Sequence, residues 1–425
     1  MKSFEPQNNL SRKVRTGAVL LTIAITAALK SPLLSPGFEL PVPDGPYSIG
    51  TIHLQFADSS RIEPLIEDSS SHRQVYAQIW YPAETPNESQ TVPYLNDAAS
   101  SMGIITSLFK LEEGFFSRVE RVRTNAYLNS QVSNAKTNYP LLLFQHGYSF
   151  WVSQNTPLME HLASNGYIVA SIGHPYETCY SINAVGELTA YSFSTPGLQL
   201  RWKEILDENL SEKLKRLINS PFSKTTLAQE KELLQLQPTM TESVKIWSDD
   251  ASFLLDKLLK LNNNLPLSAN RIDEDRIGAL GMSFGGAATA QLVNDDRRIK
   301  AGINLDGWVY GDLIGHPLNK PFMFINSDNH RNMNEIHYWQ SQSETYKVIV
   351  AGTKHLDFCD LKLIAPQYFH SRGYMGTIDK SQIIEVMNRL SLSFFEAYLN
   401  DDIEKLTETL SALPEITTAT RNVKP

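Results

Sequence analysis

Cysteine is scarce in this chain: the 425 residues include only Cys179 and Cys359. Two cysteines exclude a small scaffold stapled by several disulfides, and they exclude a zinc site built mainly from thiolates. The two side chains could form one disulfide bond or stay as separate buried thiols. The sequence leaves both possibilities open, because pairing depends on a distance that it does not give.

Basic residues are outnumbered, with 38 Lys and Arg against 46 Asp and Glu, so the formal net charge is -8. Nucleic acids are normally bound by clustered Lys and Arg, and no such cluster stands out beyond the N-terminus. We therefore expect no nucleic-acid partner. The 42% hydrophobic and 20% charged residues are ordinary for a soluble globular protein, which excludes the disordered and fibrous classes.

Also missing is an apolar run long enough to cross a membrane. The uncharged run Thr16–Leu29 is shorter than the roughly 20 residues that a spanning helix needs. It follows Arg12, Lys13 and Arg15, as the apolar region of a secretory signal follows a basic region. We predict that residues 1–30 are a signal peptide and that the protein is exported, either to the periplasm or out of the cell. An uncleaved membrane anchor and a buried N-terminal helix are the alternatives.

Short apolar runs and helix-length segments alternate along the rest of the chain. This order predicts an α/β fold with a mostly parallel central sheet flanked by helices. Five prolines between residues 32 and 46 indicate a linker over 31–46, before a domain at 47–400 and a tail at 401–425. The expected strands lie at Val75–Tyr81, Leu141–Phe144, Tyr167–Ile172, Ile277–Leu280, Ala301–Leu305, Phe322–Ile325 and Lys347–Val350.

Residues 196–241 do not fit the minimal alternation. Trp202, Leu206, Leu210, Leu214 and Leu217 recur at roughly helical spacing within a polar segment. One interpretation is a helical cap inserted over the carboxyl edge of the sheet, where lids occur. The alternative is an ordinary amphipathic helix on the surface.

The segment Gly281-Met282-Ser283-Phe284-Gly285 lies between an apolar strand and a helix of small residues. A strand, a sharp turn and a helix are what the Gly-x-Ser-x-Gly nucleophile elbow requires. Ser283 is therefore the candidate nucleophile, and a serine hydroxyl needs a nearby base that a third group orients. His355 is the candidate base, because it lies in the loop that leaves the strand Lys347–Val350.

Two aspartates compete for the role of the acid. Asp306 follows the first strand after the nucleophile, and Asp328 follows the second. Counting strands favours Asp328, whereas the apolar strand before Asp306 and the neighbouring Trp308 favour a shielded carboxylate at Asp306. Both choices keep the chain order serine, acid, histidine.

Acyl transfer also requires N–H donors that face the developing oxyanion. The N–H of Phe284, directly after the nucleophile, is one candidate. The other is the N–H of Tyr148, because Gly147 lets the chain turn closely after the strand Leu141–Phe144. His146 and His174 follow strands as well, but we interpret both as structural.

Six motifs between about residues 75 and 360 resemble those of the platelet-activating factor acetylhydrolase family of α/β-hydrolases, and they occur in the same order. They are Ile79-Trp80-Tyr81-Pro82, Gln145-His146-Gly147-Tyr148, Gly281-Met282-Ser283-Phe284-Gly285-Gly286-Ala287, Leu305-Asp306-Gly307-Trp308, Phe324-Ile325-Asn326-Ser327 and His355-Leu356-Asp357-Phe358. The resemblance implies an α/β-hydrolase fold and makes Asp306 the acid, beside Ser283 and His355. It also implies Tyr148 and Phe284 as the oxyanion hole, and neither a cofactor nor a metal.

Two residues depart from that family pattern. Met282 stands where a histidine is usual before the nucleophile, and Gly307 stands where a side chain is usual. Neither change removes a reacting group, but both alter the wall of the pocket. The acyl chain that the site accepts is therefore not defined by the resemblance.

The resemblance further implies hydrolysis of short or modified acyl chains of phospholipids. A lipid-docking surface is expected before the strand Leu141–Phe144, at Ile104, Ile105, Leu108, Phe109, Phe115 and Phe116. A helix packed on the core is the alternative for that segment, since an interfacial helix also needs a clear polar face. A general esterase or an acyltransferase could use the same triad, and a peptidase or a non-catalytic binding protein are further alternatives.

Overall fold

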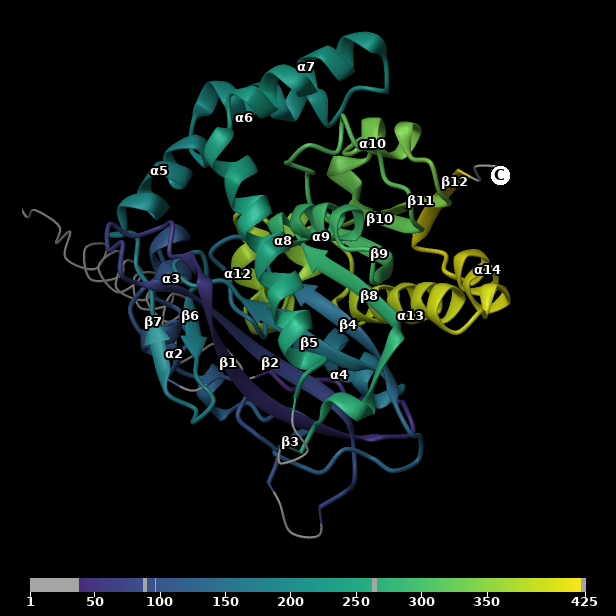
Figure 1. The fold of residues 1–425 in the computed structure, drawn as a ribbon. Coiled ribbons are helices and arrows are strands. Elements are labelled where there is room, and N and C mark those ends of the chain that lie inside the picture. The colour runs from purple at the N-terminus through teal and green to yellow at the C-terminus, as the bar shows by residue number, and fades with distance from the viewer. Residues whose placement is uncertain (1–37, 87–89, 96, 262–265, 422–425) are drawn as a thin grey trace, which may run out of the picture.

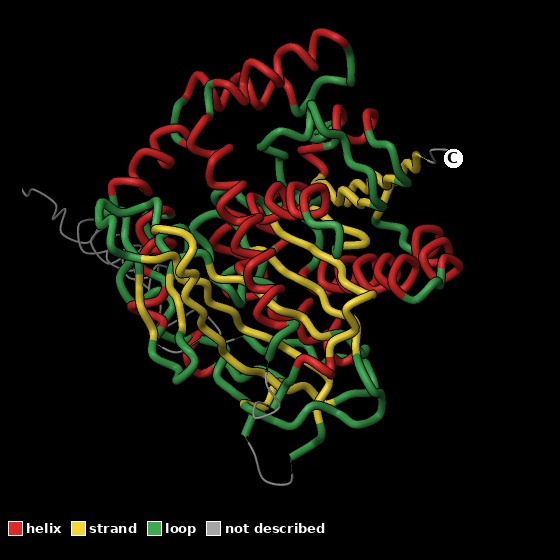
Figure 2. Tube along the Cα trace, viewed as in Figure 1, coloured by secondary structure: helices red, strands yellow, loops and turns green. Residues whose placement is uncertain are grey.

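The computed structural model describes residues 38–86, 90–95, 97–261 and 266–421. Its main feature is one ten-stranded sheet in the order β12-β11-β10-β9-β8-β4-β5-β2-β1-β3 (Figures 1 and 2). The strands are β1 (Ser48–Ile62), β2 (His72–Ala83), β3 (Ala126–Leu128), β4 (Tyr139–Gln145), β5 (Ile168–Gly173), β8 (Ile272–Met282), β9 (Ile299–Leu305), β10 (Phe322–Ser327), β11 (Thr345–Val350) and β12 (Ile416–Arg421). A separate hairpin pairs β6 (Tyr180–Ile182) with β7 (Leu188–Ala190).

The six central strands, β5, β4, β8, β9, β10 and β11, pair in parallel. Antiparallel pairs lie at the two sides, where β2 joins β5 and β1, and where β12 joins β11. Because the central strands are parallel, all of their carboxyl ends lie at one edge of the sheet. Loops leaving β4, β8, β9, β10 and β11 therefore meet there.

Helices cover both faces of the sheet (Figure 1). The helices α8 (Pro238–Leu258) and α9 (Phe284–Asp295) lie on one face, and α4 (Thr156–Ser164) and α13 (Lys380–Leu399) lie on the other. Side chains of β4 alternate between two buried clusters, with Leu142 and Phe144 in one and Leu141 and Leu143 in the other. Burial of both faces explains the continuous apolar runs of the sequence.

The predicted fold class, a mostly parallel sheet flanked by helices, is confirmed. All seven expected strands are present. The long strand β1 was not expected, because much of its outer half is exposed and polar. The segment predicted as a tail from residue 401 instead forms α14 (Ile403–Ala412) and the edge strand β12, so the fold extends past the expected boundary.

The described start of the chain packs against the domain. Phe38 and Leu40, within the expected linker, are buried in the core. Residues 1–30, for which we predict a signal, lie outside the described residues. Among the residues that the structure describes, none of the helices is both long and apolar enough to cross a membrane.

Three helices form the insertion expected near residues 196–241, and they lead into α8: α5 (Pro196–Ile205), α6 (Glu208–Leu217) and α7 (Lys224–Gln235). They arch over one side of the molecule in Figure 1. The remaining helical elements are α2 (Ala98–Ser101), α3 (Gly103–Leu108), η2 (Val119–Arg121), η3 (Ala269–Arg271), η4 (Asp328–His330), α10 (Glu335–Gln340), η5 (His355–Phe358), α11 (Leu361–Ile364) and α12 (Pro366–Ser371).

Both cysteines are buried free thiols. Cys179 and Cys359 belong to the same apolar cluster, but no disulfide joins them. Burial raises the pKa of each thiol above its ordinary value. Of the two possibilities that the sequence left open, the structure has the separate thiols.

Candidate active site

Ser283 occupies the sharp turn between β8 and α9, with φ 57° and ψ -124°. This backbone conformation is strained for a residue with a side chain, and such strain concentrates at functional sites. The flanking glycines make the turn possible. A Cβ atom on Gly281 would lie 2.2 Å from the carbonyl oxygen of Gly285, and a Cβ atom on Gly285 would lie 2.0 Å from that of Gln145.

His355 lies in η5, directly after the loop that leaves β11, and bridges Ser283 and Asp306. Its Nε2 lies 2.9 Å from Ser283 Oγ, and its Nδ1 lies 2.8 Å from Asp306 Oδ2. Since a carboxylate can only accept, Nδ1 carries a proton, and in the neutral ring Nε2 is free to accept the serine proton. The order serine, imidazole, carboxylate is that of a nucleophile with an oriented base.

Asp306 follows β9 and is buried, with φ 51°. Its Oδ1 accepts the N–H of Ser327 at 2.6 Å, and its own N–H donates to Ile325 O at 2.8 Å. Burial by itself would raise the pKa of Asp306, but the charge and hydrogen bonds of His330 and His355 hold it below the ordinary value. The carboxylate is therefore ionised, as the role of an orienting acid requires.

Asp328, the rival acid, points elsewhere. Its Oδ2 accepts the N–H of Gly352 at 3.1 Å, and its Oδ1 forms an ion pair with Arg331. It is therefore a loop aspartate with local partners. The structure brings Asp306, and not Asp328, to the imidazole of His355.

His330, at the end of η4, was not expected in this group. Its Nδ1 lies 2.9 Å from Asp306 Oδ2, the oxygen that also accepts from His355. The sequence offered one signal for it, because His330 follows β10 by three residues and its loop leaves the same sheet edge. Burial would lower the pKa of His330, but the charge of Asp306 and the hydrogen bond to it together outweigh burial and raise that pKa.

Asp306, His330 and His355 offer ligand atoms within 4.8 Å of one another. Zinc accepts one carboxylate and two imidazoles. Here, however, Asp306 Oδ2 lies 2.8 and 2.9 Å from the two Nδ1 atoms, which are distances of hydrogen bonds with a proton between the heavy atoms. We interpret the group as sharing protons and assign no metal to it.

The loop after β4 lies against the nucleophile. A Cβ atom on Gly147 would lie 3.5 Å from Ser283 Cβ, and the rings of Tyr148 and Phe284 pack edge to face with centroids 5.2 Å apart. The N–H of Phe284 begins α9, where helical N–H groups lack a partner in the helix. The N–H of Gly147 is already occupied, since it donates to Gln154 Oε1 at 2.8 Å. The structure thus brings Tyr148 and Phe284 together beside Ser283.

His146 and His174 are buried, and their hydrogen-bond partners lie outside the triad. His146 Nδ1 lies 2.7 Å from Gly147 O, and His174 Nδ1 lies 2.9 Å from Asp250 Oδ2. Burial, with the neighbouring His174, lowers the pKa of His146 to about 3, so this ring is neutral at pH 7. Both rings pack on Trp247, as the structural interpretation of the sequence expected.

The inserted helices contact both loops of the site. Trp202 of α5 donates from Nε1 to Ser149 Oγ at 3.2 Å, next to Tyr148. Glu230 of α7 accepts from Trp308 Nε1 at 3.4 Å, two residues after Asp306. The insertion therefore lies over the carboxyl edge of the sheet and covers the loops that carry the candidate groups.

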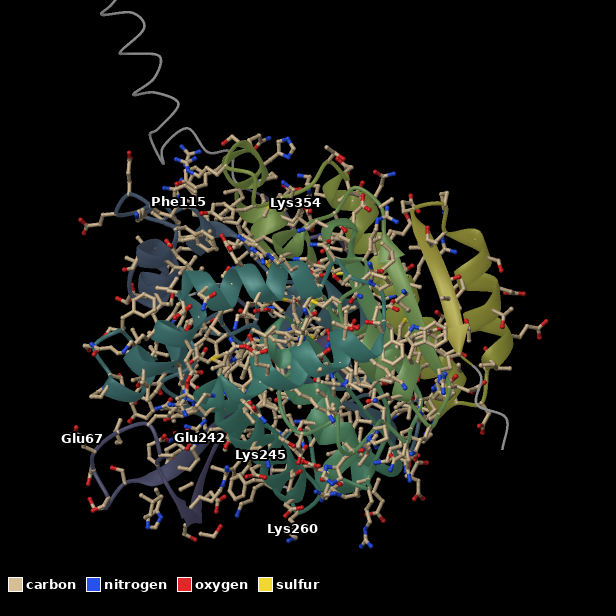
Figure 3. The ribbon with its side chains drawn as sticks, turned by 90° about the horizontal axis from the view of Figure 1, so that it is seen from above. Glu67, Phe115, Glu242, Lys245, Lys260 and Lys354 are labelled. Carbon is tan, nitrogen blue, oxygen red and sulfur yellow. The ribbon has the colours of Figure 1, made fainter. Side chains whose placement is uncertain are left out.

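The predicted lipid-docking residues do not form an open apolar face. Ile104, Ile105 and Phe116 are buried in the core, because α3 packs against it. Phe109 and Phe115 are half-buried and pack on aromatic rings of the α12 region. In Figure 3, Phe115 is labelled near the rim of the molecule. Burial contradicts the predicted docking role of Ile104, Ile105 and Phe116, for which the alternative of packing on the core holds.

Comparison with known proteins gives a consistent result. The family model "Platelet-activating factor acetylhydrolase, isoform II" matches residues 34–414. The platelet-activating factor acetylhydrolase of Cavia porcellus is 24% identical over 88% of this chain and 82% of that protein. A probable 1-alkyl-2-acetylglycerophosphocholine esterase of Arthroderma benhamiae is 22% identical over 91% of this chain and 92% of that protein.

A solved structure shares the fold. The ferulic acid esterase from Streptomyces cinnamoneus superposes with a TM-score of 0.68 at 23% identity, covering 90% of this chain and 99% of that one. At this identity the likeness concerns the fold, whereas the family model spans most of the sequence. The chain therefore belongs to the platelet-activating factor acetylhydrolase, isoform II, family.

Proposed function

We propose that this protein hydrolyses carboxylic esters, with Ser283 as nucleophile, His355 as base and Asp306 as the orienting acid. The observation that carries the proposal is the imidazole of His355, which bridges Ser283 Oγ at 2.9 Å and Asp306 Oδ2 at 2.8 Å. Family membership and the names of the relatives support an ester as the bond that is cleaved.

In the first half of the reaction, Ser283 Oγ attacks the ester carbonyl and His355 Nε2 takes its proton. The carbonyl oxygen becomes an oxyanion, which the N–H groups of Tyr148 and Phe284 stabilise. Asp306 holds the imidazolium that forms. The tetrahedral species then collapses to an acyl-enzyme as His355 returns the proton to the leaving alcohol.

In the second half, His355 takes a proton from water, and the hydroxide attacks the acyl carbon. The proton then passes to Ser283 Oγ as the carboxylic acid is released, so the enzyme returns to its starting state. The steps use only side chains and backbone N–H groups of this chain.

The relatives' names point to an acetyl group on a glycerophospholipid as the substrate. We propose a phospholipid with a short or modified acyl chain for this protein too. Both departures from the family pattern lie beside the nucleophile. Gly307 has no room for a side chain, since its Cβ would lie 1.9 Å from the carbonyl oxygen of Ser283, and Met282 is buried directly before it.

The test is hydrolysis of p-nitrophenyl esters and short-chain phospholipids by the wild type and three variants. We expect Ser283→Ala to lower kcat by about 10⁶-fold and Asp306→Asn to lower it by about 10⁴-fold, as the same losses do in other serine hydrolases. Asp328→Asn is the matched control, because it changes an aspartate of the neighbouring loop, and it should retain activity within about threefold of the wild type.

Two outcomes would contradict the proposal. Absence of turnover with every ester would reject ester hydrolysis. A loss of activity in Asp328→Asn together with an active Asp306→Asn would reject the assignment of the acid.

A further inference from the structure

Asp306 Oδ2 accepts hydrogen bonds from two imidazoles. His355 Nδ1 lies 2.8 Å away and His330 Nδ1 lies 2.9 Å away, and the two ring centroids are 6.0 Å apart. A carboxylate oxygen has two lone pairs, so these two bonds use its capacity. A triad needs only the first of them.

The two imidazoles differ at their other nitrogen. His355 Nε2 faces Ser283, whereas no described residue bonds His330 Nε2, and the His330 side chain is 20% exposed. Because Nδ1 of His330 donates to the carboxylate, any second proton on this ring binds at Nε2. The proton can therefore come from solvent without breaking the bond to Asp306.

We propose that His330 is a positioning residue that also sets the lower pH limit of catalysis: as a neutral ring it holds Asp306 in place, and as an imidazolium it blocks the base. The proposal rests on the serine-triad function above. Its basis is the shared oxygen of Asp306, which is the single buried carboxylate that both rings contact.

Charge balance gives the reason. When Ser283 attacks, His355 becomes an imidazolium, which the one negative charge of Asp306 balances. If His330 is already charged, two positive rings share one carboxylate at a centroid separation of 6.0 Å. The partly buried site screens that repulsion poorly, so proton transfer to His355 becomes unfavourable.

The other charged groups near His330 are already engaged. On η4 and directly after it, Asp328 and Arg331 form an ion pair with each other. On the loop before η5, Lys354 donates from Nζ to Gly373 O at 2.8 Å. The inserted helices contact the loop after η4 through neutral groups, because Asn332 Nδ2 donates to Asn219 O at 3.2 Å. Asp306 and His355 are therefore the partners through which a charge on His330 acts.

The sign of the pH effect follows. The Asp306 charge raises the pKa of His330 above the ordinary value of a histidine, which is about 6.5. His330 therefore takes its second proton at a higher pH than an ordinary histidine does. Activity should be low at acid pH and should rise as His330 loses that proton.

The first measurement uses the wild-type protein alone. The logarithm of kcat/KM for a soluble p-nitrophenyl ester is plotted against pH on the acid side. If both His330 and His355 must be unprotonated, kcat/KM falls by about 100-fold for each pH unit at the acid extreme. A limiting fall of about tenfold per pH unit indicates one proton and would overturn the proposal.

Two variants separate the effect of the hydrogen bond from His330 to Asp306 from the effect of the positive charge on His330. His330→Asn keeps an N–H donor near the position of Nδ1 but does not titrate, so its acid limb should fall about tenfold per pH unit. His330→Phe removes the donor as well, and its plateau in kcat should drop about tenfold at unchanged KM. Under a merely structural role, both variants would keep the wild-type slope.

The matched control is His316→Asn, which replaces an exposed histidine beside Asp312 and should keep the two-proton limb. Labelling of Ser283 by an organophosphate, followed against pH, reads the activated serine without an ester substrate. If the rate of labelling falls with two protons in the wild type and with one proton in His330→Asn, the inference about His330 is supported. This holds even if the protein hydrolyses no ester, because absence of ester hydrolysis would reject only the proposed function. A two-proton limb that persists in His330→Asn overturns the inference.

Discussion

At the scale of single residues, the site depends on where side chains are absent. The carbonyl oxygen of Gln145 and the backbone of Gly285 are so close that a Cβ atom on Gly285 would lie 2.0 Å from that oxygen. Ser283 can keep its strained backbone because its neighbours leave this space free. The nucleophile and the loop that carries Tyr148 are therefore fixed against each other by backbone contact.

Gly285→Ala should disrupt this contact. We expect the variant to lose at least 100-fold in kcat/KM and to unfold at a lower urea concentration, because backbone must move on both sides of the added methyl group. The control is Gly103→Ala in α3, where an added Cβ meets no heavy atom within 4 Å. Equal activity and equal urea midpoints for the two variants would refute the steric argument.

The sequence identified most of these residues, for physical reasons. Ser283 follows a buried strand directly and His355 lies after the loop that leaves another, and a parallel sheet brings such positions to one edge. Strand order alone could not choose between Asp306 and Asp328, because both leave neighbouring parallel strands at that edge. His330 was missed because it lies in the short 3-10 helix after β10, from which it reaches Asp306, and periodicity does not show such a short helix.

At the scale of elements, a buried ion cluster ties β2 to α8. Arg73 of β2 donates from Nη2 to Asp250 Oδ2 of α8 at 2.7 Å and from Nη1 to Glu63 Oε2 at 2.9 Å. Asp250 Oδ2 also lies 2.9 Å from His174 Nδ1. Burial would raise the pKa of Asp250, but Arg73 and His174 hold it below the ordinary value. Each of these charges has its partner inside the protein.

Arg73→Met should leave Glu63 buried without its cation and leave Asp250 with Arg61 alone, whose Nη2 lies 2.9 Å from Asp250 Oδ1. We expect a loss of about 3–5 kcal/mol in the free energy of unfolding, measured with urea at pH 7. Arg216→Met is the control, because the ion pair of Arg216 with Glu212 is exposed, and it should cost about 0.5 kcal/mol or less. Similar losses in both variants would contradict the role of burial.

The pH dependence of that loss has a definite sign. The pKa of Asp250 is lower in the folded state than in the unfolded state, so the cluster stabilises the fold fully above the unfolded pKa of about 4. Its contribution declines as the pH falls below that value toward the folded pKa. The difference in the free energy of unfolding between the wild type and Arg73→Met should therefore become smaller at acid pH.

The inserted helices illustrate what an element's own sequence can and cannot predict. Leucines at helical spacing predicted helices near residues 196–241, and α5, α6 and α7 lie there. The place of these helices in the fold depends on individual contacts with residues far away in the sequence, such as the contact of Glu230 with Trp308. A helical period indicates that one face is buried, but it does not identify the surface that covers it.

At the scale of the whole molecule, the last strand closes one side of the sheet. β12 pairs antiparallel with β11 along its length, from Thr345 with Arg421 to Val350 with Ile416. Without β12, β11 would become an edge strand with unpaired N–H and C=O groups, which invites association with other chains. β11 also leads into the loop that carries His355.

A chain that ends at Leu413 should test this closure. We expect it to aggregate and to lose most esterase activity, because the edge of β11 is exposed and the His355 loop loses support. A chain that ends at Arg421 keeps β12 and is the control. Size-exclusion chromatography and the esterase assay measure the two effects, and a monomeric, fully active chain ending at Leu413 would show that β12 is dispensable.

The segment after residue 400 also marks a limit of sequence reading. β12 contains Thr417, Thr418, Ala419 and Thr420, all four of which are exposed, so it lacks the apolar run that marks the central strands. An edge strand buries little, and its pairing is decided by the backbone of β11. The central, doubly buried strands could be predicted, whereas β12 at one edge and β1 next to the other edge could not.

The two separated thiols have a practical consequence for motion. Cys179 and Cys359 are buried in the main core, and burial raises the pKa of both, so little reactive thiolate forms in the folded protein. An alkylating reagent reaches them only when the interior opens. The rate at which the native enzyme reacts with such a reagent therefore reports how often its core opens transiently. The two thiols are thus built-in probes of local unfolding.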